Sequence, residues 1–243
     1  MKTYNFDVNG HMIEATYAKE DIEHIFMPLL NKWTDLYKKL NRRIIVIMAA
    51  PPGCGKTTLS LFLEYLSKNN DVEELQAIGM DGFHRYQDYL DTHYMLRNNE
   101  MYLMKEFKGA PETFDSFSLI ETIKKTKCND IYWPIYSRKD HNPIENQILI
   151  NKNIVLIEGN YLLLKDEPFN QIKELSDDSI FIEADLLELE KRLVSRKMMG
   201  GSMYHEAKKF YDKSDGVNVK KVLNDSINGN IHLYMHDNRY YLK

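Results

Sequence analysis

The amino-acid sequence predicts an α/β protein built on a doubly wound, mostly parallel β-sheet flanked by helices. Apolar runs at residues 44–50 and 154–157 are continuous rather than alternating, as in strands that are buried on both faces. Strand patterns then alternate with helical patterns along the chain, which is typical of βαβ units. The chain has 243 residues, of which 43% are hydrophobic, and no linker rich in Pro, Gly or Ser divides it, so one compact unit is expected.

Composition excludes several classes of protein. With 36 acidic against 32 basic side chains the net charge is −4, so the chain lacks the basic field of a nucleic-acid-binding protein. Cys54 and Cys128 have no metal-ligand spacing, which argues against a disulfide scaffold and a structural zinc site. The longest apolar stretch, residues 44–52, is about half a membrane span, and the N-terminus has no apolar signal core. A cytoplasmic protein with neither membrane nor nucleic-acid partner is expected.

Residues 1–41 are predicted to form a hairpin and a helix that pack on the domain of residues 42–243. Residues 4–8 alternate, Asn9-Gly10 favours a type I′ turn, and residues 12–17 form the returning strand. Residues 19–40 then carry apolar side chains at intervals of three and four, which predicts a helix with one buried face. Pro28 is a candidate interruption of this helix.

The rest of the chain alternates between the two patterns. After the strand at 44–50 we expect helices at residues 56–68, 115–127, 169–175, 186–199 and 203 to about 213, and strands at 75–80, 154–157, 179–184 and 231–235, with an extended piece at 130–136. Residues 81–108 form a polar and aromatic segment.

A phosphate-binding loop is predicted between the strand at 44–50 and the helix at 56–68. The loop residues are Pro52, Gly53, Cys54, Gly55, Lys56, Thr57 and Thr58. Backbone N–H groups at a helix N-terminus favour an anionic phosphate, Lys56 adds a point charge, and the Thr57 hydroxyl is a ligand for Mg²⁺. ATP and Mg²⁺ are therefore the expected cofactors. Ala50 replaces the first glycine of the motif, and the loop still forms if Ala50 keeps a negative φ.

Two carboxylates follow predicted strands on the same edge of the sheet. Asp81 stands after the second strand and can accept the proton of an attacking hydroxyl, although an Asp before Gly is more often a turn residue. Glu158 ends the strand at 154–157 and is a candidate for the metal's shell or the substrate, against the alternative of a turn acid. Arg192 and Arg196, spaced i, i+4, share one helix face and can close over a transferring phosphate, although such pairs are usually solvated.

Several further motifs carry a family resemblance. They are Met80-Asp81-Gly82-Phe83-His84, Gly109-Ala110-Pro111-Glu112-Thr113-Phe114-Asp115, Pro134-Ile135-Tyr136-Ser137-Arg138, Glu158-Gly159-Asn160-Tyr161 and the arginines at 192 and 196. Their order, with the phosphate loop, resembles that of the phosphoribulokinase, uridine kinase and type I pantothenate kinase family over residues 44–222. The resemblance implies a P-loop NTPase fold with a helical lid, Asp81 as general base, Glu158 near Mg²⁺ or substrate, and lid arginines on the phosphates. A homo-oligomer is a candidate state on the same ground.

The acceptor is not fixed by these motifs. The sequence Asp81-Gly82-Phe83 is similar to pantothenate kinase, but Arg138 stands where that enzyme would have histidine. Residues 109–115 and 214–218 look more like fructose-transport or nucleoside kinases. Candidate substrate contacts are His84, Arg85, Tyr136, Arg138 and His141.

The hypothesis from the sequence is Mg·ATP-dependent phosphorylation of a hydroxyl on a small metabolite, with Lys56 and the lid arginines stabilising the transferred group. Two alternatives stay open: a nucleotide-gated switch with a protein partner, and a degenerate kinase that only binds. The sequence has no Asn-Lys-x-Asp motif, which argues against a GTPase. Motor ATPases carry an Asp-Glu pair at the end of this strand, and here Ile157 stands in place of the Asp before Glu158, which argues against that class.

Overall fold

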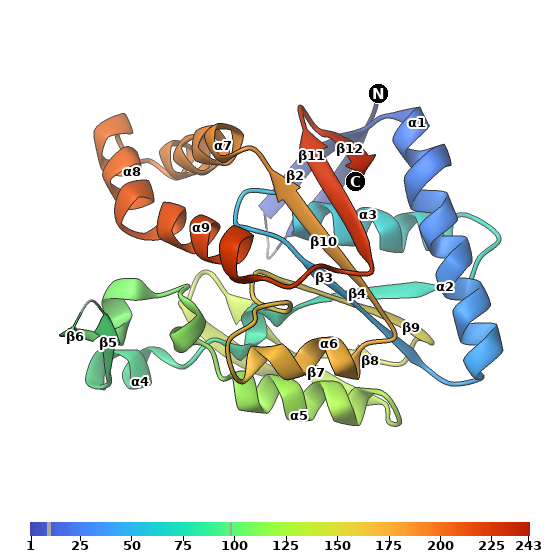
Figure 1. Ribbon diagram of the computed structural model, residues 1–243, viewed down its shortest axis with the longest axis horizontal. Coiled ribbons are helices and arrows are strands. Elements are labelled where there is room, and N and C mark those ends of the chain that lie inside the picture. The colour runs from blue at the N-terminus through green and yellow to red at the C-terminus, as the bar shows by residue number, and fades with distance from the viewer. Residues whose placement is uncertain (9–10, 98) are drawn as a thin grey trace.

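A six-stranded sheet forms the centre of the computed structural model, which describes residues 1–8, 11–97 and 99–243 (Figure 1). The strand order is β12–β11–β10–β3–β9–β4. Its parallel strands are β3 (Ile44–Ala49), β4 (Leu75–Gly79), β9 (Ile154–Gly159), β10 (Asp178–Ala184) and β11 (Ile231–His236), and β12 (Arg239–Leu242) is an antiparallel edge. The predicted α/β fold with a mostly parallel sheet is confirmed.

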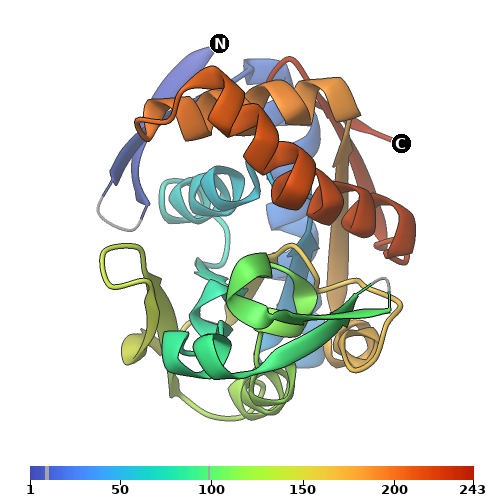
Figure 2. The ribbon, with the colours of Figure 1, turned by 90° about the vertical axis from the view of Figure 1, so that its left-hand side faces the viewer.

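Helices cover both faces of this sheet. Figures 1 and 2 show α2 (Met27–Leu40) and α3 (Lys56–Lys68) on one face and α5 (Ser116–Thr126) and α6 (Ile172–Leu175) on the other. Alternate residues of β3 serve the two layers: Ile44, Val46 and Met48 pack with the first pair of helices, and Ile45, Ile47 and Ala49 with the second. The continuous apolar run at 44–50 exists because both faces of this strand are buried.

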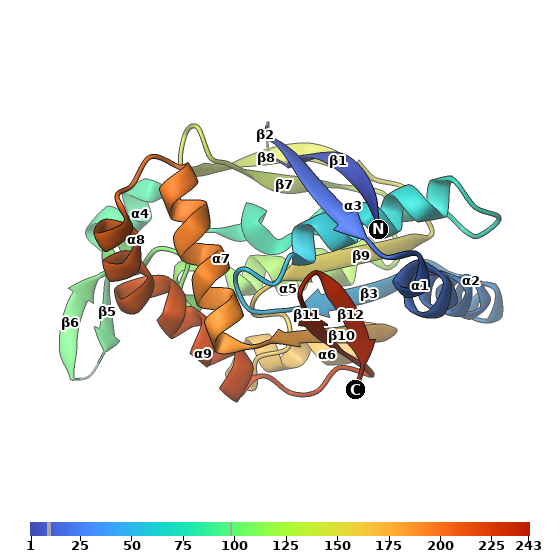
Figure 3. The same cartoon turned by 90° about the horizontal axis from the view of Figure 1, so that it is seen from above.

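Three further helices extend beyond the carboxyl end of β10, and short hairpins surround the sheet (Figure 3). The helices are α7 (Leu186–Met199), α8 (Tyr204–Phe210) and α9 (Gly216–Asp225). Outside the central sheet lie the short helices α1 (Lys19–Asp21) and α4 (Gln87–Thr92) and the antiparallel pairs β1 (Lys2–Val8) with β2 (His11–Tyr17), β5 (Tyr94–Arg97) with β6 (Glu100–Leu103), and β7 (Ile131–Ser137) with β8 (Asn142–Ile150). Single 3₁₀ turns span Met80–Phe83, Met104–Phe107, Pro111–Thr113 and Phe169–Gln171.

The N-terminal prediction holds with one refinement. Strands β1 and β2 pair as expected, whereas the predicted Asn9-Gly10 turn lies outside the described residues. The helix at 19–40 is not broken at Pro28: a π-helical turn, Ile22–Phe26, precedes it, and Pro28 occupies the first turn of α2. The preceding π-helical turn shifts the hydrogen-bond register, with the Met27 N–H donating to the Ile22 carbonyl, and a local change of this kind accommodates a residue that has no N–H.

One predicted helix boundary was wrong, and several strands were not predicted. The helix expected to end near 213 continues through a π-helical turn, Tyr211–Asp215, into α9, because Gly216 keeps helical dihedral angles. Strands β8 and β12 were missed, as was the β5–β6 pair. Each of these strands lies on an edge or outside the central sheet, where polar residues interrupt the apolar pattern.

Among the helices of residues 1–8, 11–97 and 99–243, none has both the length and the apolar composition that a bilayer span requires.

Candidate active site

The loop between β3 and α3 has the backbone geometry of a phosphate cradle. Gly53 and Gly55 have φ of +85° and +78°, values that favour glycine, and Gly55 is the N-cap of α3. Ala50 is not among the residues with positive φ, so alanine is compatible with the first motif position. Cys54 is fully buried and burial raises the pKa of its thiol to about 12, so this residue serves the loop through its backbone.

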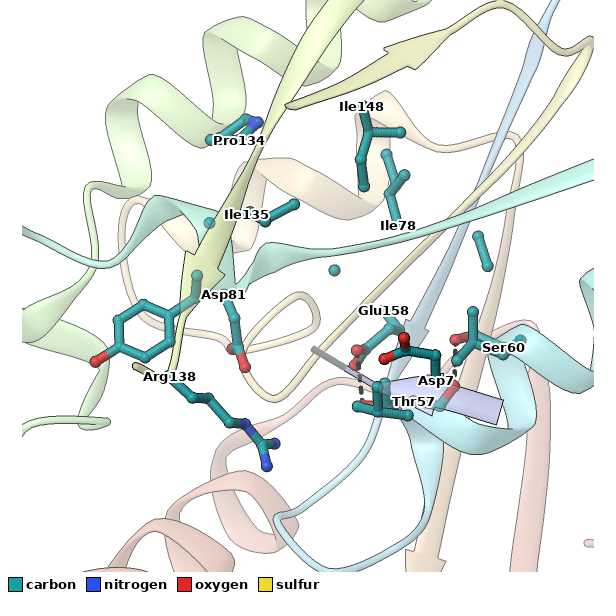
Figure 4. A pocket seen from close by; sticks show the side chains of 16 residues that line it. Asp7, Thr57, Ser60, Ile78, Asp81, Pro134, Ile135, Arg138, Ile148 and Glu158 are labelled. Atoms are coloured by element: carbon teal, nitrogen blue, oxygen red, sulfur yellow. Dashed lines mark hydrogen bonds between the residues drawn. The ribbon is translucent and has the colours of Figure 1, made fainter. Parts of the chain in front are cut away.

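Thr57 and Glu158 meet at the floor of the site (Figure 4). The Thr57 hydroxyl donates a hydrogen bond of 2.8 Å to Glu158 Oε1. Glu158 is only 7% exposed because β9 lies between β3 and β4, where its backbone is paired with Met48 and Gly79. Burial raises the pKa of its carboxyl and the nearby Lys56 ammonium opposes this rise. A hydroxyl and a carboxylate side by side are oxygen ligands that suit Mg²⁺.

Asp81 lies just beyond the carboxyl end of β4, in the 3₁₀ turn Met80–Phe83. Its side chain is exposed and points into a cavity of about 210 Å³ that Thr57, Arg138 and Glu158 also line (Figure 4). The residue before the Met80–Phe83 turn is held by a hydrogen bond, because Trp133 Nε1 donates to the Gly79 carbonyl at 2.8 Å. The carboxylate therefore has a defined position and open space in front of it.

A second cavity of about 560 Å³ brings the predicted residues together. Pro52, Lys56, Thr57, Asp81, His84, Tyr136, Arg138, His141 and Arg196 all line it. Its walls also include the cations Lys108 and Lys197 and the acid Asp215, so five Lys or Arg side chains face two carboxylates. The cavity accordingly favours anionic ligands.

His84 and Lys108 are held in place on one wall of this cavity. His84 Nδ1 lies 2.8 Å from the Asp81 carbonyl oxygen, which can only accept, so Nδ1 carries the hydrogen and Nε2 is an acceptor. Burial lowers the pKa of this imidazole. Lys108 Nζ donates to Gln87 Oε1 at 2.7 Å and to the His141 carbonyl at 2.6 Å, and burial lowers the pKa of its ammonium. A tilted contact between the rings of His84 and Tyr136, with centroids 4.7 Å apart and planes at 45°, completes the wall.

The two arginines of α7 share a face, as their spacing predicts. A cavity of about 340 Å³ is lined by Arg192 and Arg196 together with Gly53, Gly55, Lys56, Thr57 and Thr58. Arg192 is fixed by hydrogen bonds of 3.1 and 2.8 Å to Glu188 Oε1 and of 2.6 Å to Asn238 Oδ1. Arg196 is exposed and lines the 560 Å³ cavity as well.

Arg85 does not join the other predicted residues. Its guanidinium lies 3.6 Å from Asp115 and over the Tyr89 ring, in a separate cavity on the outer side of the Met80–Phe83 turn. The structure therefore does not bring Arg85 together with the other candidate substrate contacts, because its neighbour His84 lines the 560 Å³ cavity and successive side chains point in different directions.

Sequence reasoning missed several polar residues of the 560 Å³ cavity, among them Lys108, Asn160, Asp215 and Asn218. Asn218 Nδ2 donates to the Gly109 carbonyl at 3.3 Å, and burial raises the pKa of the Asp215 carboxyl. The Oδ1 atom of Asn160 is buried without a hydrogen-bond partner. The family motifs at 158–161 and 214–218, which contain Asn160, Asp215 and Asn218, were the available signal, and Lys108 directly precedes the motif at 109–115.

The chain matches the model of the phosphoribulokinase / uridine kinase family over residues 44–211. It is 40% identical over 237 residues to "Uncharacterized protein YggC" of Escherichia coli K12, covering 96% of both chains. It is 29% identical over 199 residues to "Putative uridine kinase C227.14" of Schizosaccharomyces pombe, covering 79% of this chain and 82% of that protein. The crystal structure of a "putative fructose transport system kinase" from Silicibacter sp. TM1040 superposes with a TM-score of 0.71 at 27% identity, over 79% of this chain and 89% of the other.

Proposed function

Because this chain belongs to the phosphoribulokinase / uridine kinase family, we propose that it is a Mg·ATP-dependent kinase that phosphorylates a hydroxyl group of a small metabolite. The observation that carries the proposal is that one cavity is lined by the phosphate-loop residues Lys56 and Thr57 and by the open carboxylate of Asp81. A phosphate cradle and a proton acceptor facing one space are what phosphoryl transfer to an alcohol requires.

In the proposed reaction Asp81 accepts the proton of the acceptor hydroxyl. The acceptor oxygen forms a bond to the γ-phosphorus of ATP, the bond from that phosphorus to the β–γ bridging oxygen breaks, and ADP leaves. Lys56 and Arg196 stabilise negative charge on the transferred group through their positions beside the cavity. Thr57 and Glu158 would hold Mg²⁺, which neutralises phosphate oxygens when bound.

We further propose that the acceptor carries a carboxylate or phosphate group besides its hydroxyl. Lys108 lines the 560 Å³ cavity with Asp81 and His84 and is not among the residues of the 340 Å³ cavity at the phosphate loop, whereas Arg138 lines both cavities. Lys108 is already fixed by two hydrogen bonds to neutral groups, and neither of these partners neutralises its charge. A bound anion would therefore supply a counter-charge that these two hydrogen-bond partners do not provide.

The experiment is ADP release from Mg·ATP across a panel of neutral acceptors (nucleosides, free sugars) and acidic acceptors (pantothenate, glycerate, sugar phosphates). Asp81→Asn is the matched blank, since it keeps the size of the side chain and removes the base. We expect ADP formation that depends on an acidic acceptor and falls by about 10²-fold or more in Asp81→Asn, with Mg·ATP affinity by calorimetry changed less than about threefold. Equal ADP release with and without every acceptor, or equal turnover in both proteins, would contradict the proposal and favour the nucleotide-gated switch.

A further inference from the structure

The N-terminal hairpin lies outside the segment 44–211 that the family model matches, yet it packs beside the phosphate loop. Tyr17 of β2 stacks on Phe62 of α3 with ring centroids 3.9 Å apart and planes 5° apart. Tyr4 of β1 packs against the same Phe62 ring at 4.7 Å. Thr58, in the first turn of α3, lies beside the Tyr17 phenol and donates its hydroxyl hydrogen to the Gly55 carbonyl at 2.8 Å. These contacts hold the hairpin against the helix that begins at the loop.

One wall of the 340 Å³ cavity is the edge of strand β2. Five consecutive residues, 13 to 17, line the cavity. Successive side chains of a strand point to opposite faces, so a cavity against one face would be lined by alternate residues only. A run of consecutive residues means that the backbone edge itself borders the space. In the described part of the chain β2 has one neighbouring strand, β1, so alternate N–H and C=O groups on its other edge point away from the hairpin.

The other walls come from the phosphate loop and from α7. Gly53, Gly55 and Thr58 form the side of the cavity next to the loop, and Arg192 faces it from α7, fixed by Glu188 and Asn238. The 340 Å³ and 210 Å³ cavities share Val8, Thr57 and Arg138, but of the two only the 210 Å³ cavity is lined by Asp81 and Glu158. The 340 Å³ cavity is therefore bordered by the phosphate loop, α7 and β2 without the proposed base, and its volume lies within the range of small-molecule sites.

We propose that the edge of β2 is one wall of the subsite that holds the base and ribose of the phosphoryl donor. A nucleobase offers donors and acceptors along its rim, which unpaired backbone groups of an edge strand can satisfy, while the Arg192 guanidinium lies on the opposite wall. The hairpin would thus contribute directly to nucleotide affinity, although the family model does not include it. This inference rests on the proposed use of ATP.

The test is a bulky substitution on β2 with a matched control on β1. Thr16→Trp adds an indole at the cavity wall, whereas Thr3→Trp makes the same change at the residue paired with Thr16, which does not line the cavity. Calorimetry with Mg·ATP and with Mg·tripolyphosphate separates nucleoside contacts from phosphate contacts. We expect Thr16→Trp to weaken Mg·ATP at least about tenfold and to leave Mg·tripolyphosphate within about twofold, and Thr3→Trp to change neither by more than about twofold.

A measurement on the unmodified protein accompanies these variants, in case Thr16→Trp fails to fold. In hydrogen exchange, Mg·ATP should slow exchange in residues 12–16 more than Mg·tripolyphosphate does, with no such difference in residues 2–7. Equal Mg·ATP affinities of the two variants, or equal protection of residues 12–16 by the two ligands, would overturn the hairpin inference while the kinase proposal stands. A protein that binds neither ligand would overturn both.

Discussion

The substitution Gly82→Ala tests how Asp81, the proposed catalytic base, is positioned. A Cβ atom at Gly82 would lie 2.2 Å from the Pro134 carbonyl oxygen and 2.5 Å from its carbon, in the backbone of β7. Contacts below 3.0 Å are essentially absent for real Cβ atoms, so the Met80–Phe83 turn and β7 must separate by about 0.8 Å. Because Asp81 directly precedes Gly82, its carboxylate moves with the turn.

Two consequences follow from this separation. Overpacking against backbone costs about 1–3 kcal/mol, which corresponds to a drop in Tm of roughly 2–12 °C for a chain of this size. A displacement of nearly 1 Å at the proposed base lowers kcat/KM by about 10²-fold. Mg·ATP affinity should change less than about threefold, since the phosphate loop follows a different strand.

The assays are thermal unfolding, calorimetry with Mg·ATP and acceptor-dependent ADP release. Gly159→Ala is the comparison for stability: its Cβ would lie 2.2 Å from the sulfur and 2.3 Å from the Cγ of the buried Met80, so that a side chain, rather than the backbone of another strand, has to move first. We therefore expect a smaller loss of Tm in Gly159→Ala than in Gly82→Ala. Wild-type stability and activity in Gly82→Ala, or a larger loss of Tm in Gly159→Ala, would refute the reasoning.

Two further predictions concern the nucleotide side of the site. Lys56→Ala should weaken the binding of Mg·ATP by at least about tenfold and abolish turnover, because the loop loses its point charge. An unchanged dissociation constant for Mg·ATP by calorimetry would exclude this loop as the phosphate-binding site. Glu158→Gln should lower turnover while preserving or raising stability at neutral pH. Burial raises the pKa of Glu158, so the folded protein binds this proton more tightly than the unfolded chain, and wild-type stability falls as pH rises from the ordinary glutamate range towards the raised value. The Glu158→Gln variant does not lose stability in this way, so the unfolding free energies of the variant and the wild type should converge in acid. Urea unfolding at a series of pH values measures both. A variant whose stability falls furthest below that of the wild type at neutral pH would contradict the prediction.

The sequence predicted the elements that are buried on both sides and the motifs at their ends. The helix Lys56–Lys68 has the bounds that its pattern indicated, because a loop with two glycines and the polar residues after Lys68 delimit an apolar face. Asp81 and Glu158 were placed at one edge because the carboxyl ends of parallel strands meet there.

What the sequence did not predict depends on tertiary contacts. Arg85 and His84 are neighbours in the chain, and only the packing of His84 on Phe114 and Tyr136 decides which of them faces inward. The helical segment after residue 213 was not predicted because a glycine usually marks the end of a helix. In the structure Gly216 packs closely on Tyr211: a Cβ atom at this position would lie 2.9 Å from Tyr211 Cε1. The hairpin's place beside the phosphate loop rests on contacts between Tyr17 and Phe62, which are far apart in the sequence.

The most direct test of the central claim is transfer of the γ-phosphoryl group from radiolabelled ATP in a desalted pool of small metabolites. Wild-type protein and Asp81→Asn would be incubated in parallel with Mg²⁺, and the products separated by ion-exchange chromatography. The account predicts a labelled organic phosphate with the wild-type protein that is reduced by about 10²-fold or more with Asp81→Asn. Label that appears only in inorganic phosphate, or in the same organic product with both proteins, would contradict it.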